Sequence, residues 1–97
     1  MISIYQFNKE LGDFEEIEKI ENLPLFELLD SSKILLFVDT HEKNVWIWQG
    51  ESTSTRMKFV SSQTAPHIRD KHDISFMIHS IDEGDETAAF KIFVGLV

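Results

Sequence analysis

The sequence predicts an α+β fold in which one sheet is sandwiched between a long helix and a short helix. Residues 34–38 form a run of five apolar residues closed by a polar turn, which indicates a strand buried on both faces. Residues 45–48 are dense in β-branched and aromatic side chains, as strands are. Helical patterns follow at 56–65 and 87–94, and a sheet that is apolar on both sides needs one cover on each face.

The two central strands are expected to form a hairpin. Thr40–Asn44 has the length and polarity of a connection between antiparallel neighbours. Trp46 and Trp48 are two positions apart, so their side chains point to the same face of the sheet. We expect these tryptophans to pack in the core against a helix and not to form a ligand-stacking platform.

The N-terminal third is expected to add a second hairpin and a connector. Residues 2–7 alternate with period two, and 8–13 form a turn. The apolar spacing in 14–20 also suits a helix, but the preceding strand and turn favour a strand. Pro24 disfavours a helix at 22–26. Three apolar side chains then enter the core: Phe26, Leu28 and Leu29.

The long helix is expected to begin at an N-cap serine, Ser52 or Ser54, and to run from Arg56. Pro66 lacks a backbone N–H, so the helix should end or kink near Ala65. The residues predicted to share its inner face are Met57, Val60, Ser61, Thr64 and Ile68.

After this helix, residues 74–79 read as a strand, 82–86 as an acidic turn and 87–94 as the short helix. The acids that precede the short helix suit its positive end. Its predicted inner side consists of Ala89, Phe90, Phe93 and Val94.

Composition limits the class of protein. Ninety-seven residues make one domain, 42% of them hydrophobic. No apolar run approaches the roughly 20 residues of a membrane span, and the first residues do not form a signal peptide. The absence of cysteine excludes disulfides and thiolate chemistry. We therefore expect a cytoplasmic protein.

The charge is unevenly distributed. The net charge of −8 makes nucleic acid and anionic membrane poor partners. Residues 10–30 hold eight acids and one lysine, whereas residues 51–71 hold four cations and two acids, so the helix segment carries +2. This segment could face an acidic partner, although an ordinary solvated helix face has the same pattern.

Three motifs in order resemble the gelsolin/villin/severin family. They are Leu36-Phe-Val-Asp39, Val45-Trp-Ile-Trp-Gln-Gly50, and Asp82-Glu-Gly-Asp-Glu86 with Phe90-Lys-Ile-Phe93. The resemblance spans nearly the whole chain. It implies a mixed sheet of five strands between one long and one short helix, and a long helix that binds the hydrophobic cleft of an actin subunit.

A single such domain offers one binding surface, so sequestering or capping of actin is expected more than severing, unless the chain dimerises. In the family, an intradomain calcium ion is held at positions that match Lys33-Ile34 and Met57, which offer no carboxylate. No cofactor is therefore expected. A weaker alternative places calcium among the acids near the helix end and in the acidic turn: Asp70, Asp73, Asp82, Glu83, Asp85 and Glu86.

The candidate partner-binding residues follow from helical phase. Phe59 lies off the inner face, and an outward aromatic can anchor a partner, although single exposed apolar residues are also normal. Because actin is itself acidic, the least negative surface of the domain should face it. The predicted partner-binding set is Arg56, Phe59, Gln63, Pro66 and His67.

An enzyme is not expected, because the sequence has no Ser-His-Asp order, phosphate loop or paired His and Glu on one helix. The histidines at 41, 67, 72 and 79 are expected to be surface residues. Two alternatives stay open. The first is an adaptor domain of the same fold with a trafficking or GTPase-related partner. The second is a homodimer through an exposed edge strand instead of the expected monomer.

Overall fold

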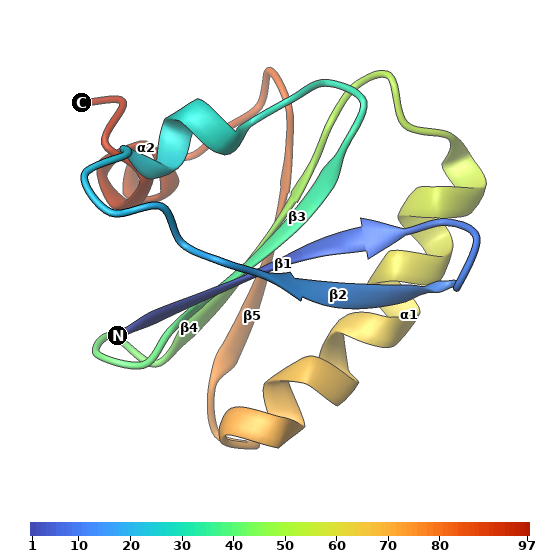
Figure 1. The fold of residues 1–97 in the computed structure, drawn as a ribbon, viewed down its shortest axis with the longest axis horizontal. Helices are drawn as coiled ribbons and strands as arrows, with labels where there is room; N and C mark the ends of the chain where they lie inside the picture. The colour runs from blue at the N-terminus through green and yellow to red at the C-terminus, as the bar shows by residue number, and fades with distance from the viewer.

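In the computed structural model, which describes residues 1–97, a five-stranded sheet lies between a long helix and a short one (Figure 1). The strand order is β2-β1-β3-β4-β5. All neighbours are antiparallel except β4 and β5, so the sheet is mixed, as predicted. The elements are β1 (Ile2–Asn8), β2 (Asp13–Ile17), the 3-10 helix η1 (Leu25–Leu28), β3 (Ile34–Asp39), β4 (Asn44–Gln49), α1 (Thr55–His72), β5 (Met77–Asp82) and α2 (Ala88–Val94).

Both predicted hairpins are confirmed. In the central one, β3 pairs with β4 so that Leu36 lies opposite Ile47, and every residue of β3 is buried. In the N-terminal one, β1 pairs with β2 so that Phe7 lies opposite Phe14, and their rings meet edge to face with centroids 5.4 Å apart. The segment that could have been helix or strand is thus a strand over Asp13–Ile17.

The sheet has a separate hydrophobic core on each face. Alternate residues of β3 point to opposite faces, so Leu36 and Val38 face α1, whereas Leu35 and Phe37 face α2. Trp46 and Trp48 belong to the core on the α2 face, which confirms that they pack against a helix.

The long helix begins as expected but does not stop at its proline. The Ser54 hydroxyl accepts a hydrogen bond from the Met57 N–H, which makes Ser54 the N-cap. The helix was predicted to end or kink near Ala65. The predicted end is wrong, because the helix continues through Pro66 to His72. Ala65 and Ile68 are buried on either side of the proline and hold both halves of the helix against the sheet.

Three further details differ from the prediction. β5 begins at Met77 and not at 74, because the Asp73 carboxylate accepts hydrogen bonds from the Ser75 N–H and hydroxyl and folds that segment into a turn. Leu25 is the buried residue of η1, whereas Phe26, Leu28 and Leu29 are only half-buried. Ala89 is exposed, because a seven-residue helix turns only Phe90 and Val94 fully inward.

Neither helix is long and apolar enough to cross a membrane.

Candidate functional site

The outward face of α1 carries one large exposed apolar side chain. The buried residues of the helix, Ser61, Ala65 and Ile68, fix which side packs on the sheet. Phe59 falls on the opposite side and is 66% exposed. Three predicted partner-binding residues, Arg56, Gln63 and His67, are also exposed, whereas Pro66 is half-buried. The structure therefore leaves four of the five accessible and shields the fifth in part.

Charges on α1 are mostly free of ion pairs within the chain. Arg69 pairs with its neighbour Asp70, with Nε and Oδ1 3.0 Å apart. The only other ion pair in the protein joins His41 to Glu42 in a distant turn. Arg56, Lys58 and Lys71 are thus unpaired, and α1 presents a positive surface on an acidic protein.

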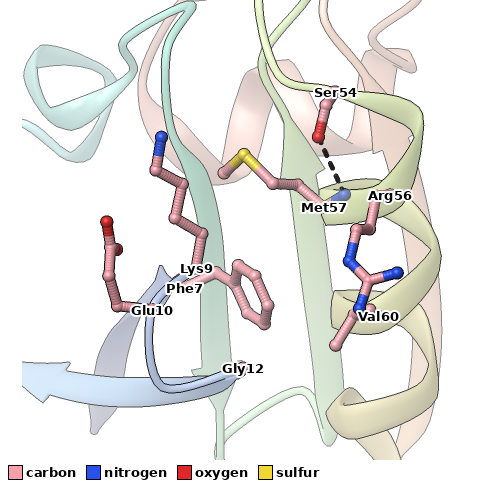
Figure 2. A pocket seen from close by; sticks show the side chains of 8 residues that line it. All are labelled: Phe7, Lys9, Glu10, Gly12, Ser54, Arg56, Met57 and Val60. Carbon is pink, nitrogen blue, oxygen red and sulfur yellow. Dashed lines mark hydrogen bonds between the residues drawn. The ribbon is translucent and has the colours of Figure 1, made fainter.

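A pocket adjoins the first turns of α1, where the helix meets the turn between β1 and β2 (Figure 2). It has a volume of about 390 Å³. Phe7, Met57 and Val60 form its apolar part, and Lys9 and Arg56 carry positive charge at its rim. The other lining residues are Glu10, Gly12 and Ser54.

Sequence analysis did not predict this pocket. Gly12 has a φ of 65°, and a Cβ built on it would meet no atom within 4 Å, so the turn leaves open space beside the helix. Leu11, next to it, is 65% exposed. The signal available in the sequence was a glycine beside an apolar residue in a turn, Leu11-Gly12. Only the fold shows that this turn lies next to α1.

The acidic turn between β5 and α2 is held by internal hydrogen bonds. Glu83 accepts from the Ser31 hydroxyl and the Glu51 N–H, each at 2.8 Å. Glu86 accepts from the Trp48 indole Nε1 at 3.0 Å and from the Gly84 N–H. Two of its four acids therefore already have structural partners.

The acids proposed as a weaker calcium site do not lie together. Asp70 and Asp73 are at the end of α1, whereas residues 82–86 follow β5, whose six residues span about 20 Å. No three acidic or histidine side chains come together as a metal-binding group. At the positions matched to the family calcium site, Ile34 is fully buried and the Lys33 carbonyl accepts the Gly50 N–H at 2.9 Å.

The four histidines are separated. His41 and His67 are exposed. His72 Nε2 lies 3.0 Å from the Tyr5 hydroxyl, and His79 Nε2 lies 2.9 Å from Asn44 Oδ1. The last two are half-buried and hydrogen-bonded, so the expectation that all four are surface residues is correct only for the first two.

No protein-family model and no curated protein matches this chain. Many solved chains resemble it, and two of them are described here. A chain in the crystal structure of the Thorarchaeota ProGel/rabbit actin complex superposes with a TM-score of 0.78 at 23% sequence identity, covering 98% of this chain and 100% of that one. A chain in the Thorarchaeota 2DGel3/rabbit actin complex gives 0.63 at 22% identity, covering 92% of this chain and 43% of that one. The likeness confirms the gelsolin-like fold that the motifs predict.

Proposed function

We propose that this gelsolin-like domain is an actin-binding module that docks the outward face of α1 on an actin subunit. The observation that carries the proposal is the superposition of 98% of the chain on a chain of the ProGel/rabbit actin complex. The exposed face of α1 supplies the contact surface, and the function is binding and not catalysis.

Phe59 is the proposed anchor. Its ring is 66% exposed and projects from the middle of the first half of α1, away from the sheet. Aromatic residues that become buried at the centre of an interface commonly carry much of the binding energy. Arg56 and Gln63 lie about one helical turn from it and His67 about two turns away, and all three are exposed and can supply polar contacts at the rim.

Charge supports the same surface. The protein carries −8 overall, whereas residues 51–71 carry +2. Actin is itself acidic, so an approach through α1 avoids the repulsion that the acidic β2 side would cause. The pocket beside Met57 adds a concave, positively rimmed region next to the helix, which an apolar side chain of actin can enter.

One α1 face per domain can occupy one actin subunit. We therefore propose sequestering of monomers or capping of filament ends, in the cytoplasm, as the mode of action. Severing would require a second grip on a neighbouring subunit, which a single copy of this face does not provide.

The test is Phe59→Ala, assayed with rabbit actin by co-sedimentation and by pyrene-actin polymerisation. Loss of a buried aromatic anchor costs roughly 2 kcal/mol, about thirtyfold in affinity. The matched control is Ile20→Ala, which removes a side chain that is 61% exposed in the connection after β2. Both variants should melt like the parent, and only Phe59→Ala should weaken binding.

Two results would count against the proposal. If Phe59→Ala binds actin as tightly as the parent, α1 is not the interface. If the parent itself fails to bind, the adaptor function with a partner other than actin takes first place.

A further inference from the structure

The short helix α2 leaves one end of the sheet uncovered. Its seven residues span about 10 Å, whereas the six residues of β4 span about 20 Å. At the end nearest the β3–β4 turn, Asp39 pairs with Asn44, and Asn44 pairs with Met77. These three residues fall on the α2 face of the sheet, and Met77 is 63% exposed.

A hollow of about 400 Å³ lies between this end of the sheet and α2. Its apolar lining is Trp46, Ala89, Ile92 and Phe93, and its polar lining is Asp39, Glu42 and Asn44. The indole of Trp46 is held in place, because it stacks on His79 at 4.5 Å and on Phe93 at 5.7 Å between ring centroids. Ile92 is 66% exposed at the edge of this hollow.

Negative charge at the hollow has no lysine or arginine as an ion-pair partner. Asp39 is only 9% exposed, and its Oδ1 accepts the N–H groups of His41 and Glu42 at 3.0 and 3.3 Å. Its Oδ2 has no hydrogen bond within the protein. No lysine or arginine lines the hollow. Lys43 lies near Asp73 instead, and His41, 3.7 Å from Glu42, is a counter-charge only when protonated.

We propose that this hollow, which we call the α2 pocket, binds an arginine or lysine side chain from a basic segment of a partner protein. Long basic side chains bury their methylene groups on apolar surface while the charged end stays polar. Here the methylenes would lie on Trp46 and Ile92, and the cation would reach Asp39 Oδ2 and Glu42.

The α2 pocket does not depend on the proposed actin function. The helices α1 and α2 cover opposite faces of the sheet (Figure 1). The residues that line the α2 pocket belong to α2, to the sheet face beneath it and to the β3–β4 turn. A partner in the α2 pocket therefore leaves Phe59 free, and the domain can hold two partners at once. Failure of actin binding would leave this proposal intact, and the reverse also holds.

The test uses the peptide acetyl-Leu-Arg-Leu-amide, titrated into ¹⁵N-labelled protein by NMR. The two indole N–H signals act as internal reporters. Trp46 lines the pocket and its Nε1 is buried without a partner, whereas Trp48 Nε1 donates to Glu86. We expect saturable, millimolar binding that shifts the Trp46 signal much more than the Trp48 signal.

The discriminating variant is Asp39→Asn combined with Glu42→Gln. Asparagine keeps the oxygen that accepts the turn N–H groups, so the turn is retained while both charges are removed. The control is Glu16→Gln with Glu18→Gln, two exposed acids at the β2 edge with the same change in net charge. Affinity should fall about tenfold in the first pair and stay unchanged in the second.

Four outcomes would overturn the proposal. The Trp46 signal could fail to move. Acetyl-Leu-Glu-Leu-amide could bind equally well, which would make the hollow simply apolar. The control pair could weaken binding as much as the pocket pair, which would indicate bulk charge. Finally, the Trp46 signal could shift with protein concentration without peptide, which would make a second copy of this chain the occupant.

Discussion

The hydrogen bond between Glu86 and Trp48 allows a direct test of why the acidic turn is acidic. Trp48 is only 1% exposed, so its indole N–H cannot reach water. Its acceptor is Glu86 Oε2 at 3.0 Å, while Oε1 of the same carboxylate accepts the Gly84 N–H at 3.0 Å. One side chain therefore satisfies a donor of the core and shapes the turn that leads into α2.

Glu86→Ala should be clearly destabilising. It leaves the Trp48 N–H buried without an acceptor, which costs about 1–3 kcal/mol. For a domain of this size, each kcal/mol lowers the melting temperature by roughly 4–8 °C. Glu86→Gln keeps an oxygen for the indole but loses the charge and the acceptor for the Gly84 N–H, which is exposed and can bond to water instead, so about 0.5–1 kcal/mol is expected. A carboxylate just before α2 also favours the helix, but both variants lose that term equally.

The free energy of unfolding of both variants is measured by thermal and urea denaturation. The same measurements in a Trp48→Phe background complete a double-mutant cycle. Without the indole donor, Glu86→Ala should cost much less than it does in the parent. Equal destabilisation by Ala and Gln, or a coupling energy of zero, would show that the turn does not depend on this hydrogen bond.

The same carboxylate gives a prediction for pH. Burial alone would raise the pKa of Glu86, but hydrogen bonds from the Trp48 indole and backbone N–H groups lower it below its ordinary value of 4.5. A carboxyl whose pKa is lower in the folded state than in the unfolded state adds to the stability at pH values above its unfolded pKa. This added stability is lost as the pH falls through the pKa of the folded state. The stability difference between parent and Glu86→Gln should therefore shrink below pH 4.5; a difference constant with pH would contradict this.

Three further predictions concern the sheet, calcium and alkaline pH. Gly50→Ala should cost about 1–3 kcal/mol in urea denaturation, because a Cβ would lie 2.7 Å from the Lys33 carbonyl oxygen and closer still to Ser31; normal stability would mean that this loop can move. Millimolar calcium should leave the melting temperature as in chelator, since no metal-binding group of side chains forms, and a rise of many degrees would reveal a site. Burial and the nearby Glu16 charge raise the pKa of Tyr5 above 10.0, so stability should fall as pH rises past that value, and Tyr5→Phe should remove this fall.

Local pattern was enough to predict most of the fold. The five apolar residues of the central strand, the polar turn and the two tryptophans determine a doubly buried hairpin, and the structure has it at β3 and β4. N-capping predicted a start of α1 at Ser52 or Ser54, and Ser54 is the cap; the prediction was possible because the cap is a local contact. The parallel pairing of β4 with β5 also requires a crossover, which α1 provides.

The errors arose where tertiary contacts outweigh local preference. Pro66 has no N–H to donate to the Ser62 carbonyl, so the helix loses one backbone hydrogen bond. Ser62 is exposed, and water can bond to its carbonyl instead. Ile74 has the composition of a strand and is 74% exposed, because the Asp73 side chain closes a turn around Ser75. Such a choice between turn and strand depends on neighbours that the apolar pattern does not contain.

Of the candidate surfaces, the outward face of α1 could be predicted from the sequence and the two pockets could not. Phe59 could be placed outward from helical phase alone, because it lies off the predicted inner face, of which Ser61 and Ile68 are buried in the structure. Neither pocket could be predicted from the sequence, because each is lined by elements far apart along the chain. The α2 pocket in particular results from a mismatch of length between a short helix and the strand beneath it.

The packing of α1 explains how a fold can persist while its recognition surface changes. Ser61 and Ala65 are fully buried, and their small side chains let the helix backbone lie close to the sheet. This contact fixes the rotation of the helix, so the residues that point outward are set by the core and not by the partner. Phe59 and its neighbours can therefore be replaced without disturbing the sheet, which is consistent with a TM-score of 0.78 at only 23% identity. It follows that the proposed actin contact must be tested through the few outward residues of α1, because the fold would look the same whichever partner they bind.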